Sequence, residues 1–364
     1  MVAGASSGRF PPPLWMSDIQ LFDCAASQRA TRVCAVCNLT YVRPDVRRWF
    51  ERRTSAAADW PVDLLLSHKG ATTVSVALPA LDEAGTVGPI VSTIRRDLME
   101  SHGLVDELVV IDSGSTDDTR SAAAAAGATV FDTRDVLPRY GDVPGKGEAL
   151  WKSLYVTSGD IVVFVDADLE QFTSSFVTGL LGPLLSDPEI AFVKAMYDRP
   201  LALGPHTAPV GGGRVTELVA RPILNLHWPA LAGFVQPLSG EYAARRSVLE
   251  ALPFGSGYGV EIGLLIDALD VVGLDALAQV DIGQRIHRNQ TDRALGRMAV
   301  EIWQVTLSRL ACEGRLSDAD VSTALTQFSR VDGQYVAQTT DVTVTERPPM
   351  LSLPEYAARR ARAS

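Results

Sequence analysis

The amino-acid sequence predicts an α/β fold with a mostly parallel, doubly wound central sheet. From residue 72 onward, short apolar segments alternate with helix-like segments. This order is typical of parallel sheets that helices cover on both faces. Three of the apolar segments are followed directly by acidic turns, and in such sheets ligands bind beyond the carboxyl ends of the strands. The pattern thus predicts the sheet and the edge that carries its binding site.

The expected elements of the first half follow one another closely. Gly127 ends an alanine-rich helix, because glycine readily adopts the left-handed conformation that closes helices. In chain order, the expected elements are an arginine-rich amphipathic helix at 43–55, a strand at 74–79, a helix at 85–100, a strand at 107–113, the alanine-rich helix before Gly127, a strand at 128–132, a helix at 147–159, a strand at 161–168 and a strand at 191–197.

The second half is richer in glycine and less regular. A helix is expected over 262–269 and a strand over 278–282. The segment 295–310 has the spacing of an amphipathic helix and is interpreted as a packing or dimerisation helix. Its apolar stripe consists of Leu295, Met298, Ile302 and Val305. Beyond residue 335 the chain is polar and punctuated by prolines, and a loosely ordered tail is expected there.

Composition and charge exclude several functional classes. The chain has 364 residues, 46% of them hydrophobic, and a formal net charge of −10, which argues against a general nucleic-acid binder. No apolar run approaches the roughly 20 residues that a bilayer requires, so no membrane anchor is expected. The four cysteines are too few for a disulfide scaffold, and a reducing cytoplasmic location is expected. Cys34 and Cys37 lack the second ligand pair of a zinc site, and residues 1–42 are interpreted as a disordered extension.

Three acidic turns are expected to meet at the carboxyl edge of the sheet. They are PALDE at 79–83, DSGSTDD at 112–118 and DAD at 166–168. Uncompensated carboxylates at one edge repel one another, so a metal ion or a hydroxyl-rich ligand is the natural partner.

Asp166 and Asp168 follow the apolar strand IVVFV. In an extended segment, residues two apart project to the same side, roughly 6–7 Å apart. That arrangement suits a hard divalent cation such as Mg²⁺, which keeps positions open for phosphate oxygens. The alternative is that the two aspartates only end a strand.

Basic and glycine-rich segments offer sites for anions. Lys146 lies in GKGEALWKS, which lacks the hydroxyl residue that a phosphate loop needs after its lysine, so it is either a single diphosphate contact or a solvated lysine. Three glycines precede Arg214 and Thr216, which suits a phosphate or carboxylate cradle, although a flexible loop is the alternative. The glycines of 255–259 follow no convincing strand, which argues against a dinucleotide fold and hydride transfer.

Three further residues are candidates for binding. His287 follows a predicted strand and is either a ligand or an ordinary structural histidine. Glu241 and Glu261 lie in glycine-rich, partly apolar surroundings that suit binding of sugar hydroxyls.

Taken together, several segments resemble a known family. They are LPALDEAGTV, VVIDSGSTDDT, GKGEALWKSL, VFVDADL, GGGRVTELVARP, QPLSGEY, PFGSGYGVEIGLLID and RIHRN. They are similar to the actinobacterial glucosyl-3-phosphoglycerate synthases, which, with the mannosyl-3-phosphoglycerate synthases, are retaining glycosyltransferases of the GT-A fold. The resemblance spans about residues 45 to 310, with a weaker echo in RPPM at 347–350.

The resemblance implies an activity and its cofactor. A hexose is expected to pass from UDP-glucose, or another nucleoside diphosphate glucose, to the 2-hydroxyl of 3-phosphoglycerate, with Mg²⁺ and with Mn²⁺ or Co²⁺ as substitutes. For retention, front-face attack is favoured, with the leaving phosphate oxygen accepting the proton. No residue is an unambiguous nucleophile. Glu261 is the one to test, first as an anchor for sugar hydroxyls.

The resemblance also assigns a role to each motif residue. Asp168 and His287 are expected to bind the metal, and Glu261, Asp168 and Leu238 are the candidate catalytic residues. The nucleotide and donor are expected to contact Pro79, Ala80, Leu81, Glu83, Ser113, Lys146, Asp166 and Arg285. The acceptor is expected to contact Gly213, Arg214, Thr216 and Asn289. Asp82 stands where many relatives have Asn, and Ala167 where many have Ser.

The same reading predicts the domain organisation and leaves alternatives open. Residues 43–200 are expected to form the nucleotide-sugar-binding half, 201–335 an acceptor-binding half whose helices make a homodimer, and 336–364 a tail. One alternative is a GDP-mannose-dependent mannosyl-3-phosphoglycerate synthase. A transferase acting on polyprenyl phosphate is disfavoured by the lack of an anchor and by Arg214. A non-catalytic sugar-nucleotide-binding protein is disfavoured by the complete set Asp166, Asp168 and His287.

Overall fold

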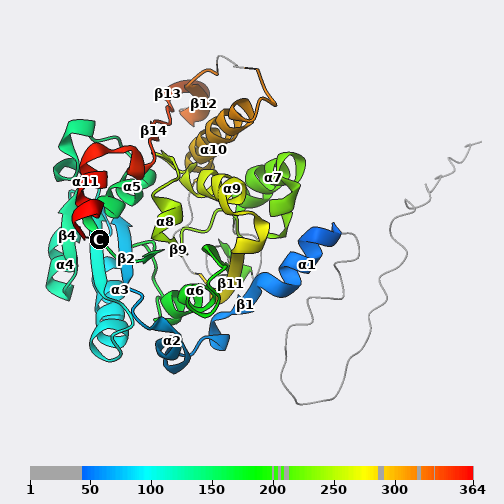
Figure 1. The fold of residues 1–364 in the computed structure, drawn as a ribbon. Helices are drawn as coiled ribbons and strands as arrows, with labels where there is room; N and C mark the ends of the chain where they lie inside the picture. The colour runs from blue at the N-terminus through cyan, green and yellow to red at the C-terminus, as the bar shows by residue number, and fades with distance from the viewer. Residues whose placement is uncertain are drawn as a thin grey trace, which may run out of the picture. The chain divides into compact units, whose positions relative to one another are not determined.

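The computed structural model describes residues 43–198, 201–203, 206–208, 213–285, 291–317, 321–331 and 333–363. Figure 1 shows their helices and strands. The predicted extension 1–42, with its CxxC pair, lies outside the described residues.

An eight-stranded sheet forms the centre of the fold, in the order β1-β11-β6-β9-β5-β2-β3-β4. Every neighbouring pair is parallel except those of β9, which runs antiparallel between β5 and β6. The strands are β1 Thr54–Ala56, β2 Val74–Ala80, β3 Glu107–Asp112, β4 Thr129–Asp132, β5 Ile161–Phe164, β6 Phe192–Asp198, β9 Tyr242–Arg245 and β11 Leu277–Gln284. The predicted mostly parallel sheet is confirmed, but sequence reasoning missed β9, since the short segment YAAR carries no apolar run.

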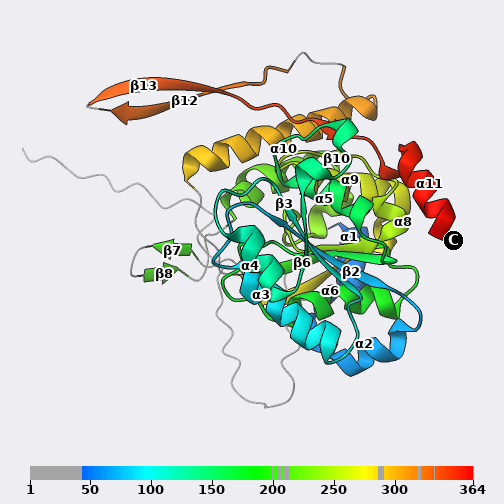
Figure 2. The ribbon, with the colours of Figure 1, turned by 90° about the vertical axis from the view of Figure 1, so that its left-hand side faces the viewer.

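Helices cover both faces of this sheet (Figure 2). Residues of β5 alternate between the two hydrophobic cores: Val162 and Phe164 pack into one, Ile161 and Val163 into the other. The helices are α1 Pro44–Arg53, α2 Val62–Lys69, α3 Val87–Ile94, α4 Thr119–Ala126, α5 Lys146–Val156, α6 Ser175–Ser186, α7 Arg221–His227, α8 Arg246–Leu249, α9 Val260–Val272, α10 Asp292–Cys312 and α11 Pro354–Ala363. Apolar residues of α2, α3 and α6 line one core, and those of α5, α9 and α10 line the other.

Local sequence explains where key helices begin and end. Gly127 ends α4 with a φ of 103°, and its N–H bonds to the carbonyl of Ala124 at 3.0 Å, as predicted. Thr291 begins α10, because its hydroxyl accepts the N–H of Ala294 at 3.3 Å. No helix among the described residues is both long and apolar enough to cross a membrane.

The C-terminal segment departs from expectation. Residues 336–364 are not a loosely ordered tail: the predicted boundary cuts into β13, Gln334–Asp341, which pairs with β12, Ala324–Val331. The chain then adds β14, Glu346–Arg347, against β10, Phe254–Gly255, and ends in α11. Met350, Leu353 and Tyr356 are buried in the core, so a few apolar side chains anchor a segment that is polar overall.

Candidate active site

A cleft of about 520 Å³ opens at the carboxyl edge of the central strands. It contains every described residue that the family resemblance assigned to the site. These are Pro79, Ala80, Leu81, Glu83, Ser113, Lys146, Asp166, Asp168, Gly213, Arg214, Thr216, Leu238, Glu261 and Arg285. The candidate Glu241, in contrast, is fully buried against Arg285 and does not line the cleft. His287 and Asn289 lie outside the described residues. Segments far apart in the sequence thus contribute to one cavity.

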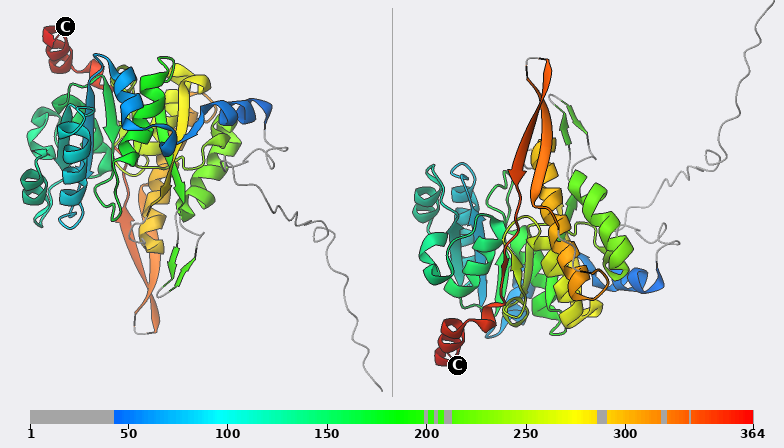
Figure 3. Two further views of the ribbon diagram at one scale, coloured as in Figure 1. Left: turned by 90° about the horizontal axis from the view of Figure 1, so that it is seen from below. Right: turned by 90° about the horizontal axis from the view of Figure 1, so that it is seen from above.

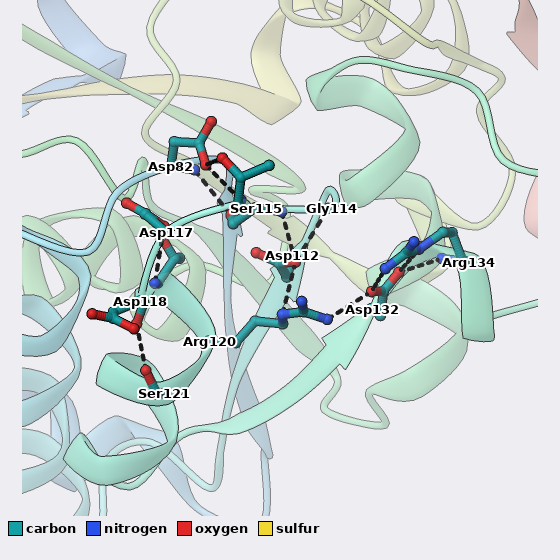
Figure 4. Close-up of polar contacts among 12 residues, drawn as sticks. Asp82, Asp112, Gly114, Ser115, Asp117, Asp118, Arg120, Ser121, Asp132 and Arg134 are labelled. Atoms are coloured by element: carbon teal, nitrogen blue, oxygen red, sulfur yellow. Dashed lines mark hydrogen bonds and ion pairs between the residues drawn. The ribbon is translucent and has the colours of Figure 1, made fainter.

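The first two acidic turns are tied to one another (Figure 4). The register of β2 and β3 places Ala80 beside Asp112. The N–H of Asp82 donates to Ser115 Oγ at 2.9 Å, and the N–H of Thr116 donates to Asp82 Oδ1 at 2.8 Å. Asp82 has a φ of 56°, a left-handed conformation that Asp and Asn adopt more readily than most residues.

These contacts change the interpretation of the acidic edge. Asp82 and Asp117 accept backbone N–H groups, and Asp112 accepts those of Gly114 and Ser115 at 3.1 Å. Contacts within the protein therefore relieve part of the expected repulsion in the first two turns, although Asp112 Oδ1 is buried without a hydrogen-bond partner among the described residues. The third turn, Asp166 to Asp168, lines the cleft and stays a candidate for a cation.

Asp166 and Asp168 are held by two basic side chains. They lie in a turn after β5, which ends at Phe164, so the predicted strand to residue 168 is too long. Nη2 of Arg285 donates to Asp166 Oδ2 at 2.7 Å and to Asp168 Oδ1 at 3.0 Å. Lys146 contacts Asp166 as well, and its Nζ lies 2.7 Å from Glu261 Oε1. The prediction that Lys146 belongs to the site is consistent with this geometry.

The charges of this cluster shift several pKa values. Burial by itself would lower the pKa of Lys146, but Asp166 and Glu261 raise it well above its usual range, so the ammonium keeps its charge. Burial likewise opposes charge on Arg285, whose pKa is nevertheless raised by Glu241, 3.0 Å from Nε, and by the two aspartates. Burial raises the pKa of Asp168, an effect that Arg285 opposes and Asp166 reinforces.

The arrangement fits a cation at Asp168 better than at Asp166. The side chain of Asp168 is 38% exposed, against 17% for Asp166. Among the described residues, no group of three His, Cys, Asp or Glu side chains is placed to hold a metal ion. A divalent ion at Asp168 would therefore need ligands from outside those residues or from the substrate. Carboxylate oxygens and phosphate oxygens are the donors that Mg²⁺ prefers.

Comparison with known proteins places the chain in a family. Residues 75–205 match the family described as Glycosyl transferase family 2. The glucosyl-3-phosphoglycerate synthase of Petrotoga mobilis is 48% identical over 80% of this chain and 90% of its own length. That of Mycobacterium tuberculosis strain H37Rv is 49% identical over 80% of this chain and 89% of its own length. The chain belongs to the glucosyl-3-phosphoglycerate synthase family.

Solved structures support the same assignment. A mannosyl-3-phosphoglycerate synthase from Rubrobacter xylanophilus superposes with a TM-score of 0.78 at 39% identity, covering 85% of this chain and 98% of its own. The Mycobacterium tuberculosis glucosyl-3-phosphoglycerate synthase with Mn²⁺, UDP and glucosyl-3-phosphoglycerate gives a TM-score of 0.70 at 48% identity, covering 80% and 95%. These likenesses confirm the family resemblance, the GT-A-type fold and the prediction of a glycosyltransferase.

Several cleft residues of this family member escaped sequence reasoning. A Cβ at Gly240 would lie 2.1 Å from Asp166 Oδ2 and 2.5 Å from Lys146 Nζ, so a side chain there is incompatible with the ion pair. Tyr258 also lines the cleft, and its position within a glycine-rich segment was the only available signal.

The apolar stripe of α10 packs within the chain, against the cleft and the core. Leu295, Met298 and Ile302 line the cleft, and Val305 is buried in the core. Of the two alternatives, packing is the one that these four side chains show, and dimerisation through α10 stays a prediction. Amphipathic spacing reveals that one face of a helix is covered, but not by what.

A lysine beneath the cleft also escaped detection. Lys194 on β6 is 1% exposed, its Nζ donates to the carbonyl of Ser239 at 2.9 Å, and it lies 4.6 Å from the ring centroid of Tyr242. Burial lowers the pKa of Lys194 to about 7, although Glu261 opposes the shift. The apolar strand AFVKAMY gave no sign that its lysine points inward.

Lys194 predicts a pH dependence of stability. Its pKa is about 7 when folded and about 10.4 when unfolded. At pH values between the folded and the unfolded pKa, unfolding therefore takes up a proton. The free energy of unfolding is highest above the unfolded pKa and decreases as the pH falls towards 7. Lys194→Met removes this titrating group, so the variant serves as the reference. The free energy of unfolding of the wild type, minus that of Lys194→Met, should rise by on the order of 1 kcal/mol per pH unit above neutrality. Urea denaturation at about pH 6 to 9 measures this, and a difference independent of pH would contradict the prediction.

Proposed function

We propose that this chain transfers glucose from UDP-glucose to the 2-hydroxyl of 3-phosphoglycerate, with retention and with a divalent metal ion. One observation carries the proposal: a single cleft combines Lys146, Arg285 and the Asp166–Asp168 turn with the glycine-rich segment at Arg214. Lys146, Arg285 and Arg214 offer cations to two anionic substrates on a protein of net charge −10. Because carboxylates pair with all three of them, a divalent ion would have to supply further positive charge. Relatives crystallised with UDP-glucose, Mn²⁺ and phosphoglyceric acid support this pairing of ligands.

Lys146 and Arg285 are proposed to serve the diphosphate. Both are cationic and lie at the edge where β2, β3 and β5 end. The same cleft contains the residues proposed to hold the base and ribose, which are Pro79, Ala80, Leu81 and Glu83. Fixed positive charges at this point stabilise the negative charge that develops on departing UDP. A divalent ion held by Asp168 and His287 would supply further charge to the same leaving group.

Gly213, Arg214 and Thr216 are proposed to bind the acceptor. Gly213 has a φ of 79°, which favours glycine, and helical structure begins directly after it at Arg214. The positive end of a helix and a guanidinium together suit a phosphate or carboxylate. Thr216 Oγ1 is buried beside the cleft without a hydrogen-bond partner among the described residues, which leaves it available to a ligand oxygen.

Glu261 is proposed to orient the donor sugar. Its carboxylate is 6% exposed and paired with Lys146, so it is held as an acceptor for sugar hydroxyls. Leu238 forms the neighbouring wall. The leaving phosphate oxygen then takes the proton of the attacking hydroxyl on the same face of the sugar, which retains the anomeric configuration.

Turnover with two donors tests the proposal. We expect 3-phosphoglycerate and Mg²⁺ to give a glucosylated product with UDP-glucose and little product with GDP-mannose, as judged by mass spectrometry. The likeness to the mannosyl-3-phosphoglycerate synthase makes GDP-mannose the second candidate donor. Product from neither donor, with UDP still bound, would instead favour a non-catalytic sugar-nucleotide-binding protein.

We further propose that the chain acts as a homodimer in the cytoplasm. Cys312 is a free thiol, which suits a reducing compartment. The hairpin β12–β13 extends past α10 (Figures 2 and 3). Phe328 and Tyr335 share one of its faces and are 69% and 74% exposed. Two strands alone are marginally stable in water, which supports cover by a second copy.

The hairpin predicts which substitutions disrupt the dimer. We expect wild-type protein to sediment as a dimer at micromolar concentration and Phe328→Ser/Tyr335→Ser to sediment as a monomer. Leu226→Ser is the matched control, since Leu226 is as exposed but lies on α7. A wild-type monomer, or a double variant that stays dimeric, would contradict this interface.

A further inference from the structure

The segment after the hairpin contacts the elements that carry two site residues. β14 pairs with β10, and the N–H of Ser256 donates to the carbonyl of Thr345 at 2.8 Å. The N–H of Thr345 donates to Ser256 Oγ at 3.1 Å in return. The loop held in this way leads directly to Tyr258 and Glu261 of the cleft.

Arg347 of the same strand is bound to α5. Its Nε and Nη2 donate to the two carboxylate oxygens of Glu148 at 2.6 and 2.7 Å, and its Nη1 donates to the carbonyl of Tyr140 at 2.8 Å. The guanidinium lies 5.3 Å from the ring centroid of Trp151, whose indole N–H donates to the carbonyl of Pro348 at 2.8 Å. Glu148 and Arg347 are both buried.

These contacts act on the first turn of α5, which begins at Lys146. The helix start is wedged against the loop that β14 holds: a Cβ at Gly147 would lie 1.8 Å from the carbonyl oxygen of Gly255. A Cβ at Gly145 would lie 2.3 Å from that of Ser256. The two glycines thus allow a close approach that fixes α5 relative to the loop before α9.

We propose that Arg347 is a positioning residue, which sets Lys146 against Asp166 and Glu261 by fixing the start of α5. The ion pair of Lys146 with Glu261 joins α5 to α9. The C-terminal segment provides a second connection, because Arg347 binds α5 and its strand β14 pairs with β10, just before α9. Without Arg347, the buried Glu148 keeps Lys152, 3.0 Å away, as its one cationic partner among the described residues. A buried carboxylate that loses its partner draws in water or shifts its backbone, and here that backbone carries Lys146.

Loss of Arg347 should weaken binding of the donor but not of the acceptor. This inference rests on the proposed role of Lys146 at the diphosphate. Displacement of a binding group by about 1 Å can cost up to about 100-fold. We therefore expect Arg347→Met to raise the KM for UDP-glucose and the Kd for UDP with Mg²⁺ by about tenfold, and to leave the KM for 3-phosphoglycerate within about twofold. Arg347→Lys, which retains charge but not the bidentate geometry, should lie between.

The experiment compares these variants with Tyr356→Phe, at temperatures well below each thermal midpoint. Tyr356 lies in the same C-terminal segment, and its ring lies near that of Tyr155 on α5, a contact that Phe retains. Tyr356→Phe removes the hydroxyl, which donates to Glu250 at 2.6 Å and accepts from Arg246. A purely structural role would lower the thermal midpoint and the active fraction but leave both KM values unchanged, and that result overturns the proposal. So does an equal rise of both KM values.

The experiment still tests the proposal if Arg347→Met does not fold or if the wild type makes no product. If Arg347→Met does not fold, the ratio of UDP affinities between wild type and Arg347→Lys carries the test, and an unchanged ratio overturns the proposal. If the wild type makes no product, the proposed function fails, while UDP affinity measured by calorimetry still tests the role of Arg347. A wild type that binds no UDP overturns both.

Discussion

Lys146→Met is expected to reduce the transfer of glucose from UDP-glucose by about 100- to 1,000-fold, because it removes a fixed positive charge from the proposed position of the leaving diphosphate. The loss should appear in both kcat and the KM for the donor. Steady-state kinetics with varied UDP-glucose at saturating 3-phosphoglycerate measures it.

A companion variant separates charge from stability. In Lys146→Met, Glu261 loses its ion-pair partner, whereas Asp166 still has Arg285. We expect Lys146→Met/Glu261→Gln to recover stability, since no buried carboxylate is then orphaned, and to recover no activity. Arg214→Met is the contrasting control and should raise mainly the KM for 3-phosphoglycerate. Activity of Lys146→Met within tenfold of the wild type would contradict the role of Lys146.

Arg285→Met is expected to cause the largest loss of stability, about 3–5 kcal/mol at neutral pH. Arg285 is 5% exposed and lies within 3.0 Å of Asp166, Asp168 and Glu241. Its removal leaves these three carboxylates facing one another, with Lys146 still in contact with Asp166. The loss should shrink as the pH falls, because protonation relieves their repulsion. Urea denaturation at neutral and acidic pH measures both effects.

Two further variants define the origin of this loss. Glu241 is fully buried, so Glu241→Gln in the Arg285→Met background should recover part of the stability. Arg53→Met is the matched control: Arg53 is 15% exposed and pairs with the single carboxylate of Asp187, so its loss should cost about 1 kcal/mol. Equal losses of unfolding free energy in Arg285→Met and Arg53→Met would contradict the prediction that the three-carboxylate cluster makes the loss of Arg285 more costly.

Much of the sheet and the site could be predicted, because short stretches of sequence show the hydrophobic periodicity of each strand and the succession of strands along the chain. Each parallel strand ends in a recognisable turn, and the carboxyl ends of such strands must meet. Strand order by itself therefore places Pro79, Ser113 and Asp166 at one edge. Glycine-rich surroundings made Arg214 and Glu261 candidates for binding, and the family motifs then assigned them to the same site, where no rule about sheets would have placed them.

The remainder depended on long-range contacts that leave no local pattern. Arg347 begins the weak family echo RPPM but lay in an expected polar tail, and no local pattern indicated its partner Glu148, which is 199 positions away. Lys194 sits in an apolar strand whose pattern does not distinguish a buried lysine from an exposed one. Asp82 and Asp117 belong to turns that were expected to face a metal ion or a hydroxyl-rich ligand, yet their carboxylates accept backbone N–H groups that the folded turns provide.

NMR of the anomeric proton during turnover tests whether this cleft transfers glucose with retention. With UDP-glucose, 3-phosphoglycerate and Mg²⁺, we predict that the α-anomeric signal of UDP-glucose is replaced by the α-anomeric signal of glucose joined to the 2-hydroxyl of 3-phosphoglycerate. A β-linked product, or release of free glucose without a glycoside, would contradict the account.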